Sequence, residues 1–103
     1  MGNIVDYSTL TVTGSVQTLV TACSPVMPSQ AHGAVMTLED GAIRWRSDAT
    51  NATATEGHRM DIGEELVFDS WTVPKNNWKT ALEALTVIRI GAKSGKLKIS
   101  WYD

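Results

Sequence analysis

The side chains of this sequence that could do chemistry are few and widely separated. It contains two histidines, His32 and His58, and one cysteine, Cys23. A cysteine or serine nucleophile needs a histidine base beside it, and a zinc site needs several His or Cys ligands at a short, regular spacing. Both histidines lie far apart in loop-forming segments, so the spacing predicts no metal pair. An enzyme would require one of them to meet Cys23 or a serine in a pocket, and we expect Cys23 to be a small core residue instead.

Two pairs of adjacent carboxylates, Glu39-Asp40 and Glu64-Glu65, are the other candidates for catalysis. Glycosidases use two carboxylates about 5 to 10 Å apart. Here Asp40 belongs to a turn and the second pair opens a strand, where charges commonly keep sheet edges soluble. The sequence contains no glycine-rich phosphate loop and no dinucleotide-binding motif. We therefore expect a protein that is not an enzyme, with no catalytic residue, no cofactor and no metal.

Length and composition indicate one compact domain over residues 1–103. Apolar residues make up 43% and charged residues 19% of the chain, and the net charge is −2. A weakly acidic chain with mixed charges does not attract phosphate backbones, so we expect no nucleic-acid partner. No apolar run approaches the roughly 18 residues needed to cross a bilayer, and the first residues lack the basic and apolar regions of an export signal. We expect no membrane association.

Alternating polar and apolar residues recur along most of the chain, as in strands with one buried face. Seven or eight short, mainly antiparallel strands are expected, at 9–13, 16–22, 34–38, 42–46, 86–90 and 96–102, with 60–62 and 66–68 forming either two short strands or one strand bent at Gly63. This spacing is typical of an all-β domain, either a small β-sandwich or a jelly-roll-like barrel. The turn Glu39-Asp40-Gly41 predicts a hairpin between the third and fourth strands, and residues 92–95 predict a closing hairpin. One short helix is expected near 79–85.

The fourth strand has two different faces. Ile43 and Trp45 lie on one face, and Arg44 and Arg46 on the other. Burial of the first pair would leave two guanidinium groups facing solvent or a partner. The segment 47–57 that follows is rich in threonine, alanine and small polar residues, and we expect it to be an exposed loop.

Four tryptophans are the unusual feature of the composition. Trp45 and Trp101 alternate in phase with aliphatic neighbours, so we assign them to the core. Trp71 and Trp78 flank Pro74 in an irregular segment. They either fix that segment to the sandwich or contact a partner chain or a glycan ring, because aromatic side chains serve both as core and as interface anchors.

Several motifs together resemble a known group of proteins. They are Gly41-Ala42-Ile43-Arg44-Trp45-Arg46-Ser47-Asp48, the Thr/Ala-rich loop to Gly57, Gly63-Glu64-Glu65-Leu66, Val87-Ile88-Arg89-Ile90 and Leu97-Lys98-Ile99-Ser100-Trp101-Tyr102. The pattern is similar to that of small β-sandwich accessory proteins of tailed-bacteriophage virions, over roughly the last two thirds of the chain. The chain departs from the group in the segment 69–84, which resembles an insertion, and in having Ala49 where a glycine commonly follows the aspartate.

The resemblance implies a structural protein of the virion, made in the cytoplasm of the host bacterium. Its expected role is head decoration or cement, packing between subunits of the major capsid protein or against another virion protein. It also implies a homo-oligomer, with a trimer favoured. The interface candidates are Trp71, Trp78, Arg44 and Arg46. The alternatives are a small neck or tail component and a carbohydrate-binding or adhesin-type β module.

Overall fold

The computed structural model describes residues 3–48, 50–69 and 77–103. Within these ranges the chain forms eight strands and two short helices. Their bounds are β1 Ile4–Val12, β2 Gln17–Thr18, α1 Leu19–Ala22, β3 Gly33–Glu39, β4 Ile43–Arg46, β5 His58–Met60, β6 Glu65–Asp69, α2 Asn77–Glu83, β7 Thr86–Arg89 and β8 Gly95–Tyr102. The predicted all-β fold is confirmed, and so is the predicted helix, which begins two residues earlier than expected.

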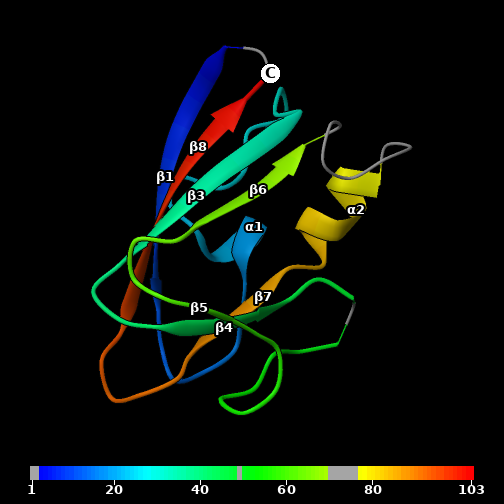
Figure 1. The fold of residues 1–103 in the computed structure, drawn as a ribbon. Coiled ribbons are helices and arrows are strands. Elements are labelled where there is room, and N and C mark those ends of the chain that lie inside the picture. Colours follow the sequence, from blue (N-terminus) through cyan, green and yellow to red (C-terminus); the bar gives the residue numbers. More distant parts are fainter. Residues whose placement is uncertain (1–2, 49, 70–76) are drawn as a thin grey trace.

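The strands form two four-stranded antiparallel sheets, and the same pairing scheme sets the strand order in both. The first sheet has the order β1-β8-β3-β6 and the second β2-β7-β4-β5. The first strand therefore pairs with the last, the second with the seventh, the third with the sixth and the fourth with the fifth. The chain is in effect one long two-stranded ribbon, folded back between β4 and β5 and wrapped into two layers (Figure 1). This arrangement is a jelly roll.

Two connections predicted as hairpins instead cross between the sheets. The Glu39-Asp40-Gly41 turn joins β3 of the first sheet to β4 of the second, and residues 90–94 join β7 to β8 in the same way. Asp40 has a φ of 76°, and a Cβ on Gly41 would lie 2.6 Å from the carbonyl oxygen of Lys93. The two crossings therefore touch backbone to backbone, which explains the glycine at this turn.

The second expected strand, 16–22, is also corrected. Only Gln17–Thr18 is extended, and the chain then turns into the single helical turn of α1. Leu19 is fully buried, and its N–H donates to the carbonyl of Leu85 at 3.0 Å. The burial of Leu19 and its hydrogen bond to Leu85 take the place of further pairing along β7.

The core lies between the sheets. Leu10, Val12, Leu82 and Leu85 are buried in it, and so is Cys23, as expected. Burial raises the pKa of the Cys23 thiol, which keeps it in its unreactive protonated form.

The two tryptophans assigned to the core differ in depth. Trp101 is fully buried, and its indole N–H donates to Oγ of Ser8 at 2.7 Å. Trp45 is only half-buried at the margin of the core, where its ring meets Phe68 edge-on at 6.2 Å and His58 at 4.6 Å between centroids. The prediction for Trp101 is confirmed, whereas Trp45 links the core to the surface.

Candidate functional site

The loop of residues 47–57, at the fold-back point of the ribbon, is attached to the outer face of the second sheet through Arg44. The Arg44 guanidinium donates to two loop carbonyls, Ala54 at 3.1 Å from Nε and Gly57 at 3.0 Å from Nη1. Arg44 was predicted to face solvent or a partner. It does point outward from the sheet, but the loop folds back over it, so its hydrogen-bonding groups are directed into the chain itself.

The loop is ordered by further hydrogen bonds. Ala52 is buried, and its N–H donates to Oγ1 of Thr86 in β7 at 3.0 Å. Thr53 closes a local turn, because its hydroxyl accepts from the N–H of Glu56 at 2.9 Å and its own N–H donates to the carbonyl of Glu56 at 2.9 Å. The expectation of a wholly exposed loop is therefore wrong at Ala52, an apolar residue whose burial the alternating threonines concealed.

Arg46, the second predicted interface arginine, pairs with Asp48. Its Nε lies 3.0 Å from Oδ1 and its Nη2 2.5 Å from Oδ2 of the carboxylate, a bidentate arrangement. The hydrogen bonds from Arg46 lower the pKa of Asp48, and those to Asp48 raise the pKa of Arg46, which the negative charge of Glu56 raises further. Arg46 is partly exposed and Asp48 is exposed, so solvent screens the pair and its effect on stability is small.

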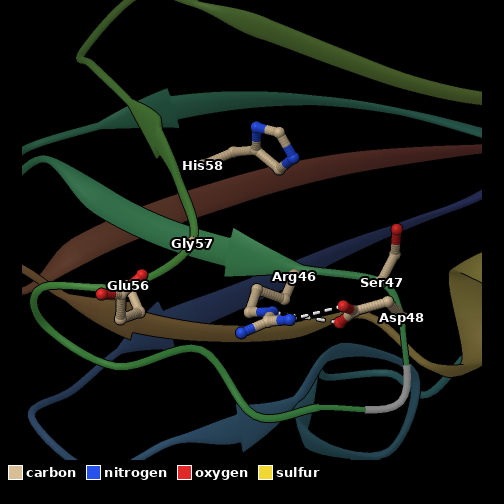
Figure 2. Close-up of a pocket in the computed structure, with 6 residues that line it drawn as sticks. All are labelled: Arg46, Ser47, Asp48, Glu56, Gly57 and His58. Carbon is tan, nitrogen blue, oxygen red and sulfur yellow. Dashed lines mark hydrogen bonds and ion pairs between the residues drawn. The ribbon is translucent and has the colours of Figure 1, made fainter.

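A polar hollow of about 370 Å³ opens beside this ion pair. It is lined by the last residue of β4, the first residue of β5 and both ends of the loop between them: Arg46, Ser47, Asp48, Glu56, Gly57 and His58 (Figure 2). Gly57 has a φ of 124°, and a Cβ there would lie 3.2 Å from Cγ of Arg46 and 3.0 Å from the carbonyl oxygen of Trp45. The positive φ and the close approach to β4 together explain the glycine at this position, a reason that the sequence alone did not show.

The hollow offers hydrogen bonds of both kinds. It combines a guanidinium, a hydroxyl and two carboxylates. In the part of the chain that the structure describes, no group of three or more His, Cys, Asp or Glu side chains is placed to hold a metal ion. This set of groups suits recognition of a polar ligand.

The outer face of the first sheet presents a second surface feature at Tyr7. This side chain is 63% exposed, although it lies near the middle of β1, the longest of the described strands. The register places Tyr7 opposite Ser100, which in turn lies opposite Val35. Because the serine between the two larger side chains is small, a shallow hollow of about 170 Å³ forms beside the tyrosine ring. Sequence reasoning missed Tyr7, because the first strand was expected at 9–13 and β1 begins at Ile4.

The free edge of β1 is closed by side chains and by a neighbouring loop. The N–H of Tyr7 donates to the carboxylate of Asp6 at 2.8 Å, Thr9 exchanges two 3.0 Å backbone hydrogen bonds with Ser24, and the side-chain amide of Gln17 donates to the carbonyl of Thr11 at 3.2 Å. Such groups prevent another strand from adding to the sheet. A partner at this side of the molecule would therefore contact side chains of the face.

The two remaining interface candidates cannot be placed at a surface. Trp71 lies outside the described residues. Trp78 belongs to α2, and its side chain lies outside the described part of the chain. No described helix is long and apolar enough to cross a membrane.

A comparison of the chain with protein-family models, with curated proteins and with solved structures finds no match. The resemblance to phage virion proteins remains a prediction from the motifs quoted above.

Proposed function

We propose that this chain is a non-enzymatic structural protein of a tailed-phage virion, which decorates the head by packing between subunits of the major capsid protein. The observation that carries the proposal is Tyr7, a largely exposed aromatic side chain on the open face of a sheet whose edge is closed to strand addition. The jelly-roll topology supports it, since this fold is common among capsid domains and lectins.

The chemistry of the Tyr7 face suits a protein partner. Tyrosine is among the residues that most often anchor interfaces, because its ring buries a large area and its hydroxyl keeps a polar partner. Two further apolar side chains of β1, Ile4 and Val5, are partly exposed near the start of the strand, and Lys98 lines the hollow beside the ring. The expected partner surface offers an apolar recess for the ring and an acidic group for the lysine.

Assembly on a lattice would strengthen a contact of this size. A single shallow aromatic contact gives weak binding, whereas a homo-oligomer such as a trimer, bound at symmetry-related sites, multiplies it through avidity. Phage heads offer such repeated sites. Binding should therefore be saturable, with a stoichiometry set by the symmetry of the shell.

The test is cosedimentation of the purified protein with capsids assembled without it. We expect saturable binding that Tyr7→Ala weakens by about 30-fold, the effect of losing an interface anchor worth about 2 kcal/mol. Ile62→Ala is the matched control, because Ile62 is a comparably exposed apolar side chain (60%) in the connection between β5 and β6. Equal binding by the two variants, or absence of the protein from purified virions, would contradict the proposal.

A further inference from the structure

We propose that the polar hollow lined by Arg46, Ser47, Asp48, Glu56, Gly57 and His58 is a binding site for a saccharide. Its volume of about 370 Å³ falls at the lower end of the range of small-molecule sites, which begins near 300 Å³. It lies at the fold-back point of the ribbon, in the second sheet, and not on the Tyr7 face of the first sheet. The proposal is therefore separate from the role in the virion.

The hollow is built before any ligand arrives. One wall is the end of β4, and the other is the end of the loop, which Arg44 holds through the carbonyls of Ala54 and Gly57. The loop is fixed again at Ala52 by the hydrogen bond to Thr86. A preformed site loses little conformational entropy on binding, which favours affinity even for a small ligand.

The charges of the hollow select against an anion. Arg46 contributes one positive charge, and Asp48 and Glu56 contribute two negative charges, so these three side chains carry a net negative charge. In Figure 2 the Arg46 side chain lies between Glu56 and Asp48. An anionic ligand approaching the guanidinium would meet a carboxylate on either side.

A neutral polyol satisfies the same groups. Its hydroxyls can donate to the two carboxylates and accept from the guanidinium, where the bond to Asp48 uses two of the five N–H groups. Ser47 can do both. The imidazole of His58 packs against the indole of Trp45, with 4.6 Å between the ring centroids, on the face of β4 and β5 opposite Arg46. The donors and acceptors gathered on the Arg46 side match the several hydroxyls of a saccharide.

The experiment is an NMR titration of the free, uniformly ¹⁵N-labelled protein with glucose, galactose and N-acetylglucosamine, and separately with ethylamine and inorganic phosphate. We expect at least one sugar to give saturable shifts of the Ser47, Gly57 and His58 amides. Asp48→Asn should weaken that binding by about tenfold or more, since it removes the charge that a hydroxyl donates to and loosens the Arg46 pair.

Asp61→Asn provides the matched control. Asp61 also pairs with an arginine two residues earlier, Arg59, at 2.8 Å, and it does not line the hollow. Equal sugar affinity in the wild type and Asp61→Asn, with the loss confined to Asp48→Asn, supports the site. The absence of saturable shifts with all three sugars, equal binding by Asp48→Asn, or binding of ethylamine or phosphate in place of the sugars would overturn it. None of these readouts depends on capsid binding.

Discussion

Replacing Arg44 by alanine tests whether this residue organises the loop of residues 47–57 or contacts a partner. The substitution removes two hydrogen bonds from a charged donor to the carbonyls of Ala54 and Gly57. Hydrogen bonds of this type contribute about 1.5 to 3 kcal/mol when buried, and less where water competes. With the bond to Ala54 exposed and the bond to Gly57 partly buried, we expect a loss of about 2 kcal/mol. For a domain of this size, that corresponds to a fall of about 10 °C in Tm.

The assay combines thermal unfolding with hydrogen exchange at the amide of Ala52, which the loop buries against Thr86. Arg44→Ala should lower the Tm and also speed exchange at Ala52, because the loop opens locally. Arg59→Ala is the control: Arg59 lies opposite Arg44 in the β4–β5 register and forms only an exposed ion pair, so its loss should cost under about 1 kcal/mol. An unchanged Ala52 amide in Arg44→Ala, with a Tm equal to that of Arg59→Ala, would refute the organising role.

Two further predictions concern the core and the ion pair. Ser8→Ala removes the acceptor of the buried Trp101 indole N–H and the donor to the carbonyl of Pro25. Urea unfolding should therefore show a fall of about 2 to 3 kcal/mol in the free energy of unfolding, and a fall below about 0.5 kcal/mol would contradict this. Asp48 should titrate by ¹³C NMR below the ordinary aspartate value of about 3.9, and Arg46→Ala should return it toward that value. Since the folded pKa of Asp48 is lowered, the small stabilisation from the pair is present above about pH 3.9 and is lost as the pH falls through the folded pKa. A measured pKa of Asp48 at the ordinary aspartate value would exclude this pH dependence.

The strands could be predicted from the sequence, but their partners could not. Alternation reports which residues of a strand face the core, and this is the same whether the next strand pairs beside it or crosses to the other sheet. Leu38 and Ile43 flank the Asp40-Gly41 turn and are both buried, as a hairpin or a crossing would equally require. What separates the two cases is the contact of Gly41 with Lys93, a long-range packing event invisible in a local pattern.

The direction of the candidate interface side chains could be predicted from the sequence, but their accessibility to a partner could not. The alternation correctly placed Arg44 and Arg46 away from the core, but an outward side chain is available to a partner only if nothing folds over it. The position of a loop depends on its own hydrogen bonds, here those of Thr53 and Ala52. Tyr7 was missed for a different reason: the first strand was expected to begin at Thr9, whereas β1 begins at Ile4, so the tyrosine was not placed in a strand.

The jelly-roll pairing separates the two candidate binding surfaces, the Tyr7 face and the polar hollow. Because the ribbon folds back between β4 and β5, the loop of residues 47–57 is its tip, and changes there alter few pairings of the first sheet. Tyr7 lies at the other end of the ribbon, where β1 pairs with β8 and β8 with β3. Substitutions at sites this far apart in the pairing scheme should act independently. Tyr7→Ala should therefore weaken capsid binding and leave sugar-induced NMR shifts intact, while Asp48→Asn should do the reverse; loss of both properties in either variant would show that the two surfaces are coupled.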